Sequence, residues 1–464
     1  MAGIGFELRK LVETRTIRGV LGAAFSGILV VAGPWLISAA SLAAAQRLPF
    51  LAAPEMALAF TGAMVWALAI SICVSAAPLY VFVRFSADLI YVGDRGEAAT
   101  LLLKYSGASA LISLPLGLGA SIFLIPSAGS SGTLLTLGFT ILLVAVNALW
   151  AAMMTATVIR KYGRILASYA LGMAVMYLLA RVLGPSLGAA GALLALAAGY
   201  ALTAILLIAA TVEALGTAPC PRAFGRLWQY SRKYRNLALA GALYAVATWV
   251  DKATLAVFGG VAAEGTRFFV NPGYDTAFYY ANLALIPGLV FYTIVTETEF
   301  NLDLKRFITY MGKRRQPEIE AAKARILRGS ALSFGRQSAF QGAVAIALAL
   351  VTPALAASLG FPEEVFVRLM AGGFFQLIFL TALNMLFYLE LYREAALSAL
   401  AFALVGLFLS VAACLSGKAT ELQGLPFLAA CLASAAMAVA FAFRGLGRFD
   451  RIVFLRASGE EFGR

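Results

Sequence analysis

Histidine is absent from this sequence of 464 residues, and recognisable catalytic motifs are absent as well. Without imidazole, the chain has neither a His-based catalytic triad nor a His-ligated metal site. The Walker A pattern, G-x-S-x-G and H-E-x-x-H do not occur, so ATP-driven transport by this chain alone is not predicted, nor is hydrolase chemistry. We therefore predict that the protein is not an enzyme and needs no cofactor or metal.

Cysteine and charge are both scarce. The four cysteines, Cys73, Cys220, Cys414 and Cys431, form no C-x-x-C pair, and we interpret them as small hydrophobic residues. Charged residues make up only 13% of the chain against 62% hydrophobic residues, with a mean hydropathy of +0.88; soluble proteins are roughly one-quarter charged. This composition predicts an all-α polytopic membrane protein.

Apolar runs recur at the length of ~20 residues that crosses ~30 Å of hydrocarbon. They predict twelve spans: 19–45, 56–83, 105–125, 134–158, 165–183, 187–212, 237–258, 274–296, 339–359, 366–387, 395–414 and 425–443. Counted in alternate connections, 30 of the 36 Lys and Arg residues fall on one side, 5 on the other, and Lys252 lies inside a span. Because cytoplasmic loops carry the excess, both termini are predicted to be cytoplasmic. The net charge of +13 is thus a topology signal, and nucleic acid is not a predicted partner.

The charge pattern also suggests a domain organisation. A basic break divides the spans into six and six, which predicts two lobes of like orientation that are related by an axis along the membrane normal. Ile4, Leu8 and Leu11 follow a helical spacing among charged residues, as in a helix that lies on the membrane surface. The predicted segments are the amphipathic helix 1–18, the lobe 19–213, the basic cytoplasmic linker 214–236, the lobe 237–443 with a cytoplasmic insertion 297–337, and the basic tail 444–464.

The insertion 297–337 is the only sizeable polar region. Pro317 is expected to open a surface helix with Ile319, Ala322 and Ile326 on one face. Clustered basic residues beside such a helix can bind anionic lipid or dock a cytosolic partner, although simple positive-inside anchoring explains the charge equally well. The candidate docking residues are Glu297, Glu299, Lys313, Arg314 and Arg315.

Two charges interrupt the predicted span 237–258, where Trp249 precedes Asp251 and Lys252. A charge at the centre of a bilayer costs at least ~2.5 kcal/mol and normally faces a partner or a wet cavity. Neighbours on a helix point about 100° apart, so the two side chains should have different partners. Lys252 with Asp275, and Asp251 with Arg368, are candidate pairs. Two interpretations of these charged residues are equally good: a buried ion pair that fixes helix register, or a role in binding substrate or protons.

Other polar and bend-forming residues lie within the spans. Tyr280 and Asn282 are predicted deep in 274–296, where an aromatic face beside an amide suits a sugar ring. Proline removes a helical hydrogen bond, and an adjacent glycine allows flexing or close approach. Candidate functional bends are therefore Gly33-Pro34 and Pro287-Gly288.

Several of these stretches together resemble one known family, the PelG inner-membrane transporters of the bacterial Pel exopolysaccharide. The resemblance runs from end to end and is most specific in residues 1–11. The stretches that carry it are MAGIGFELRKL, Gly33-Pro34-Trp35, Trp249-Val250-Asp251-Lys252, Tyr274-Asp275 and Glu297-Thr298-Glu299-Phe300. Where the family pattern leads us to expect a basic residue ahead of Glu297, this chain has Thr296.

The resemblance implies a twelve-helix protein similar to the multidrug/oligosaccharidyl-lipid/polysaccharide exporter superfamily, in the bacterial inner membrane. It further implies export of an N-acetylgalactosamine-rich polymer for the biofilm matrix. The implied partners are a cytosolic glycosyltransferase and a membrane-bound cyclic-di-GMP receptor, besides membrane lipids. Two alternatives stay open: an ion-coupled flippase of a lipid-linked oligosaccharide, and a scaffold of the synthase that conducts nothing.

Overall fold

The computed structural model describes residues 17–126 and 130–451, so the predicted helix 1–18 and most of the tail 444–464 lie outside or at the edge of the described residues. The described chain is almost entirely helical, and an isolated antiparallel bridge joins Val261 to Val270. Its residues form two compact units. The first comprises residues 17–31, Val250–Lys252 and the chain from Pro272 on, and the second comprises Ala32–Trp249 and Ala253–Asn271.

The second unit is built from the first half of the α-helices in chain order. Close packing of α5 against α4 and α6 centres on fully buried side chains such as Phe139 and Leu193. The helices are α2 (Ile17–Gln46), whose first half belongs to the first unit, α3 (Pro54–Val92), α4 (Arg95–Leu124), α5 (Ser130–Val158), α6 (Tyr162–Leu215), α7 (Ala223–Lys233) and most of α8 (Arg235–Gly259).

Helix α6 is 54 residues long but is interrupted at Gly188, whose φ of 58° and ψ of −135° are non-helical. Only glycine adopts this backbone region readily. The parts before and after the kink pack on each other, because a Cβ on Gly172 would lie 1.9 Å from Thr203 Oγ1 and 2.5 Å from the Gly199 carbonyl oxygen. Small residues of this kind let membrane helices approach closely. The sequence prediction of two spans, 165–183 and 187–212, matches these two parts.

Substituting Gly172→Ala should therefore destabilise the protein. The added methyl has no room, and overpacking a tight interface costs about 1–3 kcal/mol. Thermal unfolding in detergent is expected to show a clear fall in midpoint temperature. Gly163→Ala in the first turn of α6 is the matched control, because nothing lies within 4 Å of a Cβ placed there. An equal midpoint for the two variants would contradict the tight crossing.

The segment after α8 folds back onto the second unit. Phe268 is fully buried against Phe139, with ring centroids 5.4 Å apart, and a Cβ on Gly62 would lie 2.7 Å from Phe268 Cβ. Trp66 Nε1 donates a hydrogen bond of 2.9 Å to the carbonyl oxygen of Phe269. The loop is thus anchored by side-chain burial on α3 and α5.

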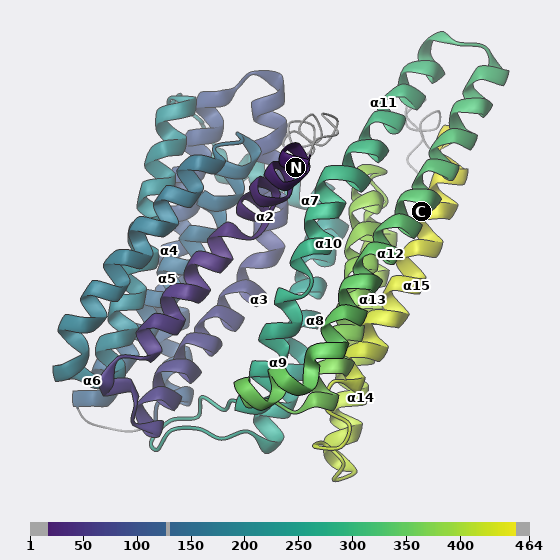
Figure 1. The fold of residues 1–464 in the computed structure, drawn as a ribbon. Coiled ribbons are helices and arrows are strands. Elements are labelled where there is room, and N and C mark those ends of the chain that lie inside the picture. Colours follow the sequence, from purple (N-terminus) through teal and green to yellow (C-terminus); the bar gives the residue numbers. More distant parts are fainter. Residues whose placement is uncertain (1–16, 127–129, 452–464) are drawn as a thin grey trace. The chain divides into compact units, whose positions relative to one another are not determined.

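The first unit contains the remaining helices, coloured from teal to yellow in Figure 1. Helix α13 lies at its centre and packs against α9, α12, α14 and α15. A π-helical turn, η2 (Tyr292–Thr296), joins α10 to α11. The helices are α9 (Pro272–Leu283), α10 (Ile286–Phe291), α11 (Glu297–Lys313), α12 (Gln316–Leu359), α13 (Glu363–Tyr388), α14 (Tyr392–Leu415) and α15 (Leu425–Gly447).

The polar insertion corrects one expectation. Pro317 does open a helix, but that helix continues without a break into the predicted span 339–359 and forms α12, which is 44 residues long. Ile319, Ala322 and Ile326 do share a buried face, as predicted. Helices α11 and α12 pack together as a hairpin that extends beyond α13 and α15 (Figure 1). The prediction of a separate surface helix is therefore wrong, because α11 packs on the apolar face of α12.

Ten helical stretches in the part of the chain that the structure describes are long and apolar enough to cross a membrane. They include the whole of α6 as one stretch and the run Pro272–Lys313 as another. Helix α8, with 25 residues, is not among them; Asp251 and Lys252 lower its hydropathy. The protein is a multi-pass membrane protein.

Candidate functional site

Asp251 is a buried carboxylate inside α8, with 4% of its surface exposed. The Tyr274 hydroxyl on α9 donates a hydrogen bond to Asp251 Oδ2, and the Ser410 hydroxyl on α14 donates one of 2.7 Å to Oδ1. Both oxygens are thus held by hydroxyl groups, and no described Lys or Arg forms an ion pair with them. Within the first unit, the short piece Val250–Lys252 of α8 meets α9 and α14 at one carboxylate, and hydrogen bonds take the place of a salt bridge there.

Lys252 points to a different set of neighbours, as the helix geometry predicts. Its Nζ lies 3.1 Å from Asp275 Oδ1, with side-chain exposures of 15% and 18%, and 5.9 Å from the centre of the Phe278 ring. The predicted pair of Lys252 and Asp275 is confirmed. Trp249, one turn earlier in α8, is half-buried, and its place in a substrate passage stays a prediction.

Arg368 does not pair with Asp251, so that expectation is wrong. Its Nη1 donates to the carbonyl oxygens of Glu421 at 2.5 Å and Gln423 at 3.3 Å, and its Nη2 lies 2.9 Å from Glu364 Oε2. The long side chain of an arginine near a helix end can bring its guanidinium to carbonyl oxygens at the membrane surface. Reaching a carboxylate buried within the membrane would cost more free energy, because the charge would leave water. Arg368 therefore binds the turn between α14 and α15 to α13.

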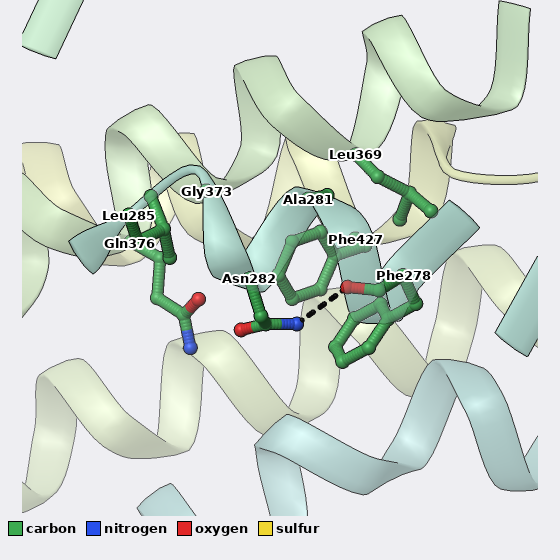
Figure 2. Close-up of a pocket in the computed structure, with 8 residues that line it drawn as sticks. All are labelled: Phe278, Ala281, Asn282, Leu285, Leu369, Gly373, Gln376 and Phe427. Carbon is green, nitrogen blue, oxygen red and sulfur yellow. Dashed lines mark hydrogen bonds between the residues drawn. The ribbon is translucent and has the colours of Figure 1, made fainter. Parts of the chain in front are cut away.

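Tyr280 and Asn282 lie on the same helix but border different spaces. Asn282 Nδ2 donates to the Phe278 carbonyl oxygen in its own helix at 2.8 Å. With Gln376 it lines a narrow gap that leaves no room for a water molecule (Figure 2). Tyr280 instead borders a groove of about 480 Å³ whose other lining residues are apolar, including Leu283, Leu348 and Phe366. A role in sugar binding stays a prediction for both.

The two candidate bends differ. Next to Pro287 the helix is interrupted, because α9 ends at Leu283 and α10 begins at Ile286. A Cβ on Gly288 would lie 2.3 Å from Gln341 Oε1 and 2.4 Å from a Leu377 methyl, so this glycine permits close approach. Helix α2, in contrast, runs through Pro34 without interruption, and a Cβ on Gly33 would lie 2.4 Å from a Leu166 methyl. A functional bend at Gly33-Pro34 remains a prediction.

Glu297 is not on the surface, which corrects its assignment as a docking residue. It is 4% exposed, and the Tyr388 hydroxyl donates to its Oε1 at 2.7 Å. The π-helical turn η2 immediately before it places one extra residue in the helix, and such turns are frequent at functional sites. Next to it, Thr296 Oγ1 donates to Gln337 Oε1 at 3.2 Å, and Gln337 Nε2 donates to Thr381 at 2.8 Å.

The other docking candidates lie on the hairpin. Glu299 accepts a hydrogen bond of 2.7 Å from Ser333 and lies 3.3 Å from Arg336, so it ties α11 to α12. Lys313, Arg314 and Arg315 are exposed at the hairpin tip. Among the docking candidates, these three basic residues are the exposed ones, and their contact with another molecule stays a prediction.

Sequence reasoning missed the polar face of α12 and several hydroxyl partners. Ser333, Gln337 and Gln341 recur every four residues and are buried, at 3%, 2% and 1% exposure. Gln341 Nε2 donates to the Ala284 carbonyl oxygen at 2.9 Å, where Pro287 breaks the helix. The spacing of four is a signal that could have been read as one helical face. Nothing in the sequence connects Asp251 with Ser410, 159 residues away.

The polar residues of the first unit thus form two groups, one around Asp251 and Lys252 and the other around η2. Among the residues that the structure describes, no group of three or more Cys, Asp or Glu side chains could hold a metal ion. What the geometry offers is hydroxyl, amide and carboxylate groups inside helices that cross a membrane. Such groups can contact a hydrated solute or hold helices in register.

Solved structures that are similar in fold to this chain include membrane transporters of the MOP superfamily. An outward-facing multidrug resistance MATE family transporter of that superfamily is 14% identical, covering 92% of this chain and 96% of its own, with a TM-score of 0.55. An inward-facing one is 13% identical over 86% and 92%, with a TM-score of 0.53. MATE in a bent conformation is 13% identical over 94% and 97%, with a TM-score of 0.54. At these identities the likeness concerns the fold alone.

The family follows from the sequence itself. Residues 1–454 match the family described as "PelG: Putative exopolysaccharide Exporter (EPS-E)". The chain belongs to the PelG family, as the resemblance of its motifs indicated. No curated protein matches the chain significantly. Family and fold together support membrane export of a polysaccharide or lipid-linked substrate.

Proposed function

We propose that this protein carries a growing, N-acetylgalactosamine-rich exopolysaccharide across the bacterial inner membrane, from a cytosolic synthase to the periplasm, for the biofilm matrix. The observation that carries the proposal is the match of nearly the whole chain to an exopolysaccharide exporter family, on a transporter fold. The protein acts as a passage and not as an enzyme. A polymer that a processive synthase pushes from one side needs no ATPase in its path.

Twelve crossings with both termini in the cytoplasm are part of this proposal. The kink at Gly188 supports counting α6 as two crossings. Helix α8 is 25 residues long, enough for ~37 Å at ~1.5 Å per residue, which supports counting it as a crossing despite its charges. Together with the other nine stretches these give twelve. The distribution of 30 against 5 basic residues supports the orientation, and the division into two lobes at 214–236 goes with it.

One observation weighs against a lipid-diphosphate cargo and one favours it. A pyrophosphate headgroup requires several converging cations, whereas Lys252 is paired with Asp275 and Arg368 is bound to the turn before α15. The apolar groove beside Tyr280, in contrast, suits an acyl chain better than a sugar. A flippase of a lipid-linked oligosaccharide is therefore the second candidate function.

The proposed partners are a cytosolic glycosyltransferase and a membrane-bound cyclic-di-GMP receptor. The hairpin of α11 and α12 supports this, because it extends beyond the other helices of its unit and exposes Lys313, Arg314 and Arg315 at its tip. A rigid, basic projection of this kind fits the acidic surface of a partner that must be held near the membrane.

Reconstitution tests the proposal. The protein, the glycosyltransferase and the receptor are placed in sealed vesicles, the donor UDP-N-acetylhexosamine is added outside, and polymer is measured with and without a glycosidase outside. We expect polymer to be protected inside the vesicles only when this chain is present.

Polymer that stays fully accessible to the glycosidase would leave the protein as a scaffold, and the proposal would be wrong. Transport of a lipid-linked oligosaccharide in vesicles that lack the synthase would instead establish the second candidate. Vesicles with the synthase alone are the control for leakage.

A further inference from the structure

Helix α7 (Ala223–Lys233) lies between two membrane helices and is fastened to the second unit by one of its faces. It follows α6 after a short loop, and only Tyr234 separates it from α8. Ala223, Leu227 and Tyr230, at i, i+4 and i+7, pack against the apolar residues at the end of α3 and the start of α4. This face is therefore already occupied.

Polar contacts fix the same face. Arg226 Nη1 lies 2.5 Å from Glu97 Oε2 on α4, and the Tyr230 hydroxyl donates a hydrogen bond to Asp88 on α3. The Tyr230 ring also packs on Phe85, with centroids 4.9 Å apart. Since Phe85 and Asp88 follow directly on the predicted span 56–83, α7 is held at the level where that span leaves the hydrocarbon.

The opposite face of α7 carries large aromatic side chains that are at least half exposed. Phe224 and Trp228, at i and i+4, are 50% and 61% exposed. Arg232, one turn further on, has its guanidinium carbon 5.2 Å from the centre of the Trp228 ring. Two aromatic rings and a cation thus form a single exposed stripe, Phe224, Trp228 and Arg232, on this helix.

All the charged residues in the segment that contains α7 are basic. Residues 214–236 contain five basic residues, Arg222, Arg226, Arg232, Lys233 and Arg235, and no acidic residue. Arg226 is neutralised by Glu97. Arg222, Arg232, Lys233 and Arg235 remain exposed around the aromatic stripe. Tryptophan favours the membrane interface, and each Lys or Arg near an anionic leaflet adds attraction for it.

We propose that α7 is an interfacial lipid-binding helix, in which Phe224 and Trp228 insert among the headgroups of anionic phospholipids and Arg232, with its basic neighbours, binds their phosphates. The fastening of α7 to α3 and α4 keeps this stripe at the depth of the headgroups. The inference concerns a lipid contact on the second unit and does not depend on which solute the protein exports.

Tryptophan quenching by brominated lipid tests the proposal on the full-length protein in nanodiscs. The bilayer is phosphatidylcholine alone or a mixture with phosphatidylglycerol, and bromine is placed on the acyl chains of one lipid at a time. The Trp228 signal is the difference between wild type and Trp228→Phe, a change that keeps an aromatic ring at an exposed position. We expect this signal to be quenched by lipid, and at least twofold more strongly by brominated phosphatidylglycerol than by brominated phosphatidylcholine in the mixture.

Arg232→Glu should bring that ratio close to one, whereas Arg325→Glu, an equal change of charge on an exposed position of the hairpin, should leave it unchanged. A Trp228 signal that acrylamide quenches and brominated lipid does not would overturn the proposal. Protection of Trp228 only after the glycosyltransferase is added would also overturn it, and would identify the stripe as a protein contact.

Discussion

The substitution Asp251→Asn should reduce polysaccharide export by about tenfold or more, a loss of at least ~1.4 kcal/mol, while the amount of protein in the membrane stays close to that of wild type. An amide keeps the volume of the side chain and one acceptor oxygen for Tyr274 or Ser410. It removes the negative charge, which the structure holds with two hydroxyl groups at a buried position. Secreted polymer and membrane abundance are measured on the same cells.

Asp94→Asn makes the same chemical change in an exposed turn between α3 and α4 and is the matched control. Normal export by Asp251→Asn would show that the charge is dispensable. If Asp251→Ala only lowers abundance, and a triple apolar change at Asp251, Tyr274 and Ser410 restores both abundance and export, the group is structural.

Removing one member of the Lys252 and Asp275 pair should destabilise the protein strongly, and removing both should restore most of the loss. Lys252→Met leaves a carboxylate without its cation at a site where only 18% of the Asp275 side chain is exposed. Breaking a buried pair in this way costs about 3–5 kcal/mol, and the lower end applies because some exposure remains. Asp275→Asn in addition to Lys252→Met removes the uncompensated charge.

A double-mutant cycle on the midpoint of thermal unfolding measures this coupling. Arg164 and Glu213, which lie 3.6 Å apart with 61% and 67% exposure, form the control pair, and their cycle should give a coupling near zero because exposed ion pairs contribute little. Additive losses at Lys252 and Asp275 would contradict the pair as the source of the effect. Export by the stable double variant then shows whether the charges also serve transport.

The membrane helices were largely predictable because the thickness of hydrocarbon sets their length. The predicted span 425–443 begins at the first residue of α15, and 19–45 lies within one or two residues of α2 at both ends. The opposite charges of Lys252 and Asp275 and their positions at one end of two successive spans were enough to suggest their contact. These features depend on composition and on order along the chain, which a sequence displays directly.

The contacts of hydroxyl and guanidinium groups were not predictable in the same way. Ser410 is one of many serines, and only the packing of α14 on α8 makes it a donor to Asp251. Arg368 was expected to satisfy a buried charge, but carbonyl oxygens in its own neighbourhood are closer. Glu297 looked like a surface residue because charged residues follow it, whereas its side chain is buried and accepts a hydrogen bond from the Tyr388 hydroxyl on α13. Each of these depends on tertiary packing that no local pattern encodes.

The π-helical turn between α10 and α11 has a consequence for the register of everything that follows it. Five residues, Tyr292–Thr296, occupy a stretch in which the backbone bonds to the fifth residue instead of the fourth. If the same residues formed an uninterrupted α-helix instead, the extra residue would turn α11 by about 100° and shift it by ~1.5 Å. Glu297 would then leave Tyr388, and Phe300, Leu304 and Phe307 would leave their buried positions. The π-helical turn therefore accommodates one additional residue, so that α10 before it and α11 after it can each keep the contacts of their own buried face.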